Sequence, residues 1–134
     1  MIVVDTSALI AILEGEPEAA ELVQALTSYD APLLSAASLV EAGVVLTKRH
    51  GRKAVEKLKA LIEAAGIDVE PVTPEQASTA IEAFARFGKG LHKAGLNYGD
   101  CFAYALAKTN GLPLLFKGDD FTHTDLKSAR TARV

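Results

Sequence analysis

Acidic residues stand at four places in the 134-residue sequence where the adjoining segments are apolar. Asp5 ends the run IVVD, Glu41 lies within SLVEAGVV, and Asp100 precedes CFAYALA. Asp119 and Asp120 follow shortly after LLF. Carboxylates packed together without cations repel one another, so such a cluster stays ionised only with a divalent cation. Oxygen ligands without Cys or His favour Mg²⁺ or Mn²⁺ over zinc.

Each acid also has a local interpretation that needs no chemistry. Asp5 can cap the helix that follows it, and Asp100 stands three residues after Asn97, as in a helix capping box. The Asp119–Asp120 pair can form a polar turn, and Glu41 can pair with a distant Arg or face solvent. The sequence around any single acid leaves this choice open. Their joint occurrence in one small domain favours a shared site.

Short apolar segments alternate with helical patterns, which predicts one α/β domain over residues 1–134. We expect strands in IVVD, PLLS, IDVEPV and LPLLFKG. Short apolar strands between helices predict a short parallel β-sheet with helices on both faces. Residues 125–134 are expected to form a loosely ordered basic tail.

The predicted topology brings the acids to one edge of this sheet. Ligands of open parallel sheets bind at the carboxyl ends of the strands, where the following helices begin. Asp5 ends the first predicted strand, Asp119 follows the last one, and Asp100 stands in the first turn of a helix. We therefore expect these three carboxylates on one rim, with Glu41 as the fourth acid.

Composition narrows the class of protein further. Hydrophobic residues make up 49% of the chain, which argues against disorder. Cys101 is the only cysteine, so no intrachain disulfide can form, which suits a cytoplasmic location. The N-terminus does not read as a signal peptide, and no apolar run reaches membrane-spanning length.

Four segments together resemble the PIN-domain ribonucleases, and in particular the VapC-type toxins of bacterial toxin–antitoxin pairs. They are MIVVDTSALIAIL, SLVEAGVVL, LNYGDCFAYALAK and PLLFKGDDF, and their order and spacing are similar to the family's over nearly the whole chain. The resemblance implies a metal-dependent endoribonuclease. It also implies that Mg²⁺ or Mn²⁺ is bound by Asp5, Glu41, Asp100 and Asp119.

The same resemblance carries further expectations. Members of the family vary at the fourth acid, so Asp120 is an alternative to Asp119, and Thr6 or Ser7 is expected to help order water at the metal. The implied partners are RNA, a second copy of the chain in a homodimer, and a VapB-type antitoxin that blocks the acidic site. Four apolar residues are candidates to line a groove for the antitoxin, with the core as their alternative location: Ile12, Leu13, Leu22 and Leu26.

The formal net charge of −3 argues against binding of nucleic acid by bulk electrostatics. Setting the four acids aside changes this charge to +1. Basic residues gather in three regions, where they can hold RNA phosphates or simply be solvated: Lys48, Arg49, Arg52, Lys53 and Lys57; Lys89, His92 and Lys93; and Lys127, Arg130 and Arg133.

Two other functions are compatible with the acids. A metal-dependent phosphatase or phosphotransferase could use Asp5 as its nucleophile, but enzymes of the haloacid dehalogenase type have a second Asp where this chain has Ser7. A non-catalytic RNA-binding PIN module is the other alternative, and the intact set of acids argues against it. Metal-dependent cleavage of RNA separates the three functions.

Overall fold

The computed structural model describes residues 1–130, and the four strands found there form one parallel sheet in the order β3-β2-β1-β4. The strands are β1 (Val3–Val4), β2 (Leu33–Ser35), β3 (Asp68–Glu70) and β4 (Leu114–Leu115). Val3 pairs with Leu33 on one side and with Leu114 on the other, so β1 lies inside the sheet. The predicted α/β domain with a short parallel sheet is confirmed.

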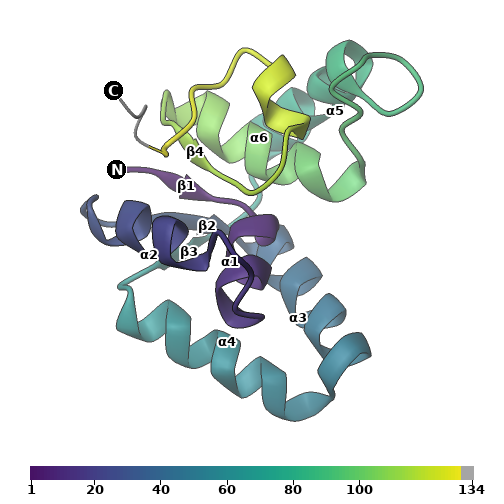
Figure 1. Ribbon diagram of the computed structural model, residues 1–134. Helices are drawn as coiled ribbons and strands as arrows, with labels where there is room; N and C mark the ends of the chain where they lie inside the picture. The colour runs from purple at the N-terminus through teal and green to yellow at the C-terminus, as the bar shows by residue number, and fades with distance from the viewer. Residues whose placement is uncertain (131–134) are drawn as a thin grey trace.

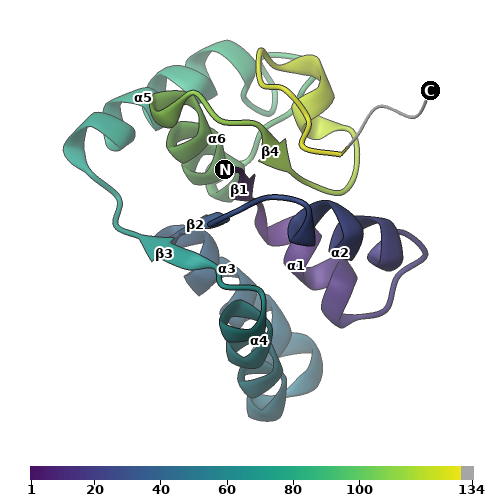
Figure 2. The same cartoon turned by 90° about the vertical axis from the view of Figure 1, so that its left-hand side faces the viewer.

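Helices connect the strands and cover both faces of the sheet (Figures 1 and 2). They are α1 (Thr6–Leu13), α2 (Ala19–Thr27), α3 (Ala36–His50), α4 (Arg52–Ala64), α5 (Pro74–Phe87), α6 (Tyr98–Asn110) and the 3-10 helix η1 (Asp120–His123). Within residues 1–130, no helix is long and apolar enough to cross a membrane.

The alternation of side chains along the strands divides the core into two layers. Successive strand residues point to opposite faces of a sheet. Val4 and Leu115 therefore join the buried residues of α1 to α4, whereas Val3 and Leu114 join those of α5 and α6. Figure 1 shows the same division, with α5 and α6 above the sheet and α4 below it. The short strands are buried on both sides, as their continuous apolar sequences predict.

The chain order creates a crevice at the carboxyl ends of β1 and β4. The chain leaves β1 through α1 and α2 to reach β2, and it enters β4 from α6, which covers the other face. Neighbouring strands whose connections run to opposite faces leave a gap beyond their carboxyl ends, where ligands of such sheets bind.

The structure decides between groove and core for the four apolar residues of α1 and α2. Leu22 and Leu26 are core residues with 0% and 2% exposure, because α2 packs this side against the sheet, so neither lines a surface groove. Ile12 and Leu13 are half-buried at the edge of the same core.

The C-terminal segment up to Arg130 differs from the loosely ordered tail that the sequence predicted. Leu114 N–H donates to the carbonyl of Lys127, and Ala129 N–H donates to the carbonyl of Leu114. Ala129 is fully buried, and Arg130 forms an ion pair with Glu21. The remainder of the predicted tail lies outside the described residues.

Candidate active site

A pocket of about 490 Å³ lies at the carboxyl edge of the sheet and brings together acids from four parts of the chain. Its wall includes Asp5, Glu41, Asp100 and Asp120. Asp119, the residue preferred from the sequence, is exposed and is not part of this wall. The pocket therefore collects three of the predicted acids together with the alternative for the fourth.

Asp5 follows β1 and is both a helix cap and a buried acid. Its Oδ2 accepts hydrogen bonds from the Ser7 backbone N–H at 2.9 Å and from the Ser7 hydroxyl at 2.5 Å. Its Oδ1 is buried without a hydrogen-bond partner among the described residues, and the residue is only 2% exposed. Burial raises the pKa of Asp5 to about 6; the Ser7 bonds oppose this rise, and the charge of Glu41 adds to it.

Asp100 occupies the first turn of α6, where it completes a capping box. Its Oδ2 accepts from the Asn97 N–H at 3.0 Å, and Asn97 Oδ1 accepts from the Asp100 N–H at 2.9 Å. Burial, followed by the charges of Asp5, Asp120 and Glu41, raises the pKa of Asp100 to about 7 against the opposing Asn97 bond. The capping interpretation and the shared-site interpretation thus apply to the same carboxyl group, because one oxygen caps and the group still faces the other acids.

Glu41 reaches the site from α3 and lies against the start of α6. A Cβ atom added to Gly99 would stand 2.1 Å from Glu41 Oε2 and 2.7 Å from Oε1. The carboxylate therefore fills the space that any side chain at Gly99 would need. The positive end of the α6 dipole favours an anion at this position.

The loop after β4 determines which of the two neighbouring aspartates faces the pocket. Gly118 has a positive φ of 93°, and η1 begins at Asp120. Phe121 anchors this turn in the core, where it is 2% exposed and its ring lies 5.3 Å from that of Phe116. The sharp turn places Asp120 in the wall of the pocket and Asp119 outside it.

Thr6 and Ser7 use their hydroxyl groups to hold protein atoms in place. Thr6 Oγ1 donates to the Ser38 carbonyl at 3.1 Å, which ties α1 to α3. The Ser7 hydroxyl donates to Asp5 and accepts from the backbone N–H of Lys117 at 3.0 Å. Ser7 thus connects the carboxylate after β1 to the loop after β4. The expected role of these hydroxyls in ordering water stays a prediction.

The donor set fits an oxygen-ligated divalent cation. Asp5 Oδ1 is a buried carboxylate oxygen without a partner, and such an atom is costly unless a cation or a proton satisfies it. The acids line an open pocket, and among residues 1–130 no group of three or more Asp, Glu, His or Cys side chains is arranged to hold a metal ion. Mg²⁺ commonly keeps several waters beside one or two carboxylates, so it does not require such a group.

Several residues of the pocket wall were not predicted as site residues from the sequence. Glu14, Glu16 and Lys117 line it beside the acids, and Arg49, which the sequence placed only within a basic region, lines it as well. Periodicity identifies helix faces but not which long side chains reach across a crevice, so no local pattern could have identified them.

The resemblance to PIN-domain ribonucleases implied a parallel α/β domain with several acids around one pocket. The structure has this arrangement, with acids after β1, on α3, in the first turn of α6 and in the loop after β4. The family model described as PIN domain matches residues 2–127. The chain belongs to the PIN-domain family and, within it, to the VapC proteins. Ribonuclease VapC28 of Mycobacterium tuberculosis is 49% identical over 132 residues, which cover 98% of this chain and 99% of that protein. VapC ribonuclease Mb0640 of Mycobacterium bovis is 46% identical over 124 residues, covering 92% and 95%.

Two solved structures share the fold. VapC20 of M. tuberculosis, described as a sarcin-ricin loop cleaving toxin, matches with a TM-score of 0.80 at 21% identity and covers 98% of this chain and 100% of its own. A toxin-antitoxin complex from Klebsiella pneumoniae matches with a TM-score of 0.68 at 18% identity, covering 93% of both chains. At these identities the likeness bears on the fold alone.

Proposed function

We propose that this protein is a Mg²⁺- or Mn²⁺-dependent endoribonuclease that hydrolyses RNA phosphodiester bonds. The observation that carries the proposal is the convergence of four carboxylates on one pocket, with a buried and unpartnered oxygen on Asp5. The curated relatives, which are named ribonucleases, support the same activity.

The residues of this site have two roles: some would bind the cation, and others orient those ligands. Asp5, Glu41, Asp100 and Asp120 would hold the cation, which when bound would supply an activated water and stabilise the charge that develops on the phosphoryl group. Ser7 fixes the orientation of Asp5 through two hydrogen bonds, and Asn97 does the same for Asp100 through one.

Cleavage of RNA is expected to require Mg²⁺ or Mn²⁺ and to stop with a chelator. The same ions should raise the thermal unfolding midpoint without RNA, because a ligand that binds only the folded state stabilises it by roughly 2.7 kcal/mol at a hundredfold excess over Kd. Mn²⁺ should give the larger shift. Differential scanning fluorimetry and a labelled-RNA assay measure both effects. Cleavage that persists in chelator, or no shift with either ion, contradicts the metal site.

Gly99→Ala is expected to lower cleavage about 10- to 100-fold with little change in thermal stability, because a displacement of about 1 Å in a reacting group costs this much. The added methyl group would occupy the position of the Glu41 carboxylate, whose flexible side chain moves away without disturbing the backbone. Gly43→Ala on α3 is the matched control, because a Cβ there meets nothing within 4 Å. Equal cleavage by the two variants would show that Glu41 does not need its observed position.

We also propose that the protein is the toxin of a VapB–VapC pair, acts in the cytoplasm as a homodimer, and is inhibited by a cognate antitoxin. The names of the relatives and the toxin-antitoxin complex among the solved structures support a protein partner. An apolar groove between α5 and α6, lined by Ile81, Phe84 and Tyr98, supports self-association. An inhibitor that faces several carboxylates is expected to insert an Arg, whose fork suits carboxylate pairs.

Co-expression with the small protein encoded beside this one is expected to give a complex that is inactive on RNA. The antitoxin should bind through an amphipathic helix and place an Arg near Asp5 and Asp100. Co-purification followed by the cleavage assay tests this. An active nuclease recovered with the neighbouring product unbound would reject the toxin–antitoxin role and leave the proposed nuclease intact.

A further inference from the structure

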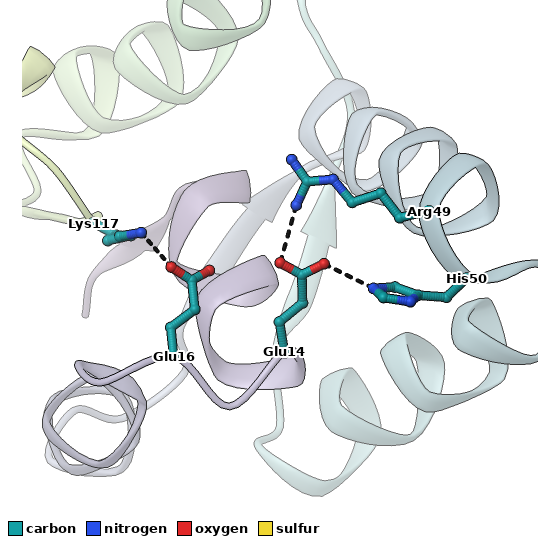
Figure 3. Close-up of polar contacts among 5 residues, drawn as sticks. All are labelled: Glu14, Glu16, Arg49, His50 and Lys117. Atoms are coloured by element: carbon teal, nitrogen blue, oxygen red, sulfur yellow. Dashed lines mark hydrogen bonds and ion pairs between the residues drawn. The ribbon is translucent and has the colours of Figure 1, made fainter.

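Two cationic side chains line the same pocket as the acids. Arg49 projects from the last turn of α3, and Lys117 follows β4. Figure 3 shows both side chains pointing toward the turn after α1, which carries Glu14 and Glu16. Among the described residues of the pocket wall, Arg49 and Lys117 are the only Lys or Arg side chains.

The contacts hold each cation on its own carboxylate. Arg49 Nη1 lies 2.9 Å from Glu14 Oε1, and the other oxygen of Glu14 lies 2.8 Å from His50 Nε2. Lys117 Nζ pairs with Glu16 Oε1. The Arg49 side chain is 54% exposed and that of Lys117 is 36% exposed, so both can also reach a ligand from solvent.

These bonds leave donors for a further partner. A guanidinium group carries five N–H donors, one of which Arg49 gives to Glu14, and a lysine ammonium group carries three. Both groups bind phosphate, Arg as a planar fork and Lys as a point charge. The ion pairs therefore fix the position of the two cations without using up their capacity to bind a phosphate.

A contribution to the stability of the fold does not explain why the Arg49–Glu14 and Lys117–Glu16 ion pairs lie at this place. Ion pairs between exposed side chains contribute little to stability. The two pairs could have formed on any surface of the domain, yet both lie in the wall of the pocket that carries the acids. A phosphodiester strand that enters this pocket meets carboxylates first, so its neighbouring phosphates need cations within reach.

The backbone ties one of these cations to the acids. The Lys117 N–H donates to Ser7 Oγ, which in turn donates to Asp5. The start of the Lys117 side chain is thus held at a fixed distance from Asp5. Arg49 approaches from α3, on the other side of the turn after α1 in Figure 3, and it lines the same pocket as Lys117 and the acids.

We propose that Arg49 and Lys117 bind RNA phosphates that neighbour the bond that is cleaved. Glu14 and Glu16 hold these cations at the rim of the pocket before RNA arrives. This inference rests on the proposed ribonuclease function. It assigns phosphate binding to one arginine and one lysine rather than to the basic regions as a whole.

Binding of a fluorescein-labelled single-stranded RNA of mixed sequence tests the assignment. Fluorescence anisotropy is measured at several salt concentrations in an Asp100→Asn background, in which the RNA should stay intact. Arg49→Gln and Lys117→Gln should each weaken binding about fivefold and lower the slope of log Kd against log salt concentration by about 0.7, the value for one phosphate contact on a single strand. The double variant should lower the slope by about 1.4.

Two matched controls remove an ion-paired cation elsewhere. Arg86→Gln and Lys108→Gln make the same changes of charge, and both residues pair with Asp125 outside the pocket. The controls should bind RNA like the parent, and all variants should keep its thermal unfolding midpoint.

The outcomes separate this inference from the proposed function. If Arg49→Gln and Lys117→Gln match the controls in affinity and salt slope while the unmodified protein cleaves RNA, the phosphate assignment is overturned and the ribonuclease stands. If the unmodified protein neither cleaves nor binds RNA with Mg²⁺ or Mn²⁺, the proposed function fails, and this inference fails with it.

Discussion

Replacement of Asp100 by asparagine is expected to reduce RNA cleavage about a thousandfold or more, because groups that act as a unit in a site cannot replace one another. The amide keeps the shape of the side chain, and its oxygen can still accept from the Asn97 N–H, so α6 should keep its capping box. The charge that faces Asp5, Glu41 and Asp120 is lost. A labelled-RNA assay with circular dichroism as the folding control measures the effect. Cleavage at the wild-type rate would remove Asp100 from the site.

The same variant should change how stability depends on pH in metal-free protein. The pKa of Asp100 is raised to about 7 and that of Asp5 to about 6, mainly by burial, so the folded state holds these protons more tightly than the unfolded state. The stability that these groups contribute is therefore complete below the unfolded pKa near 4 and is lost as the pH rises through about 6 to 7. Thermal unfolding midpoints should fall from pH 5 to pH 8, and Asp100→Asn should reduce the fall. An unchanged pH profile would contradict this account.

Asp120→Asn is expected to lower cleavage about a hundredfold, a loss typical of one removed charge at such a site. Asp119→Asn should cleave at close to the wild-type rate, because Asp119 lies outside the pocket wall that contains Asp120, although both side chains are exposed. The two variants differ by one position and make the same change, so each controls for the other. A larger loss of cleavage with Asp119→Asn would show that Asp119, which the sequence favoured, is the fourth acid.

Three of the four acids that line the pocket were predicted from the sequence, because each lies in or next to a regular element with a clear apolar pattern. Asp5 follows a buried strand, Glu41 lies on a helix, and Asp100 begins one. Parallel topology then implies that their elements meet at one edge of the sheet. The choice between Asp119 and Asp120 depends instead on the backbone after Gly118 and on the buried ring of Phe121. Turn geometry of this kind is not readable from residue types.

The class of fold was predictable from the sequence, whereas features that depend on contacts between distant segments were not. Alternating short strands and helices identified the α/β class, whereas apolar residues in excess of one helix face did not reveal that Leu22 and Leu26 are core. The segment near Ala129 was predicted as a loosely ordered basic tail because its residue types do not reveal the burial of Ala129 or the pairing with Leu114 that hold it against the sheet. Long-range contacts decided both cases.

The position of β1 within the sheet has a consequence for the synthesis of this protein. Asp5 leaves the ribosome early, but β1 requires β4 as a neighbour, and Asp120 follows β4. Pairing between distant segments must wait until the later segment is available. A nascent chain that stops before Leu114 lacks one neighbour of β1, and one that stops before Asp120 lacks an acid. Aborted translation products therefore lack part of the pocket, and the complete pocket can form only when almost the whole chain has been made.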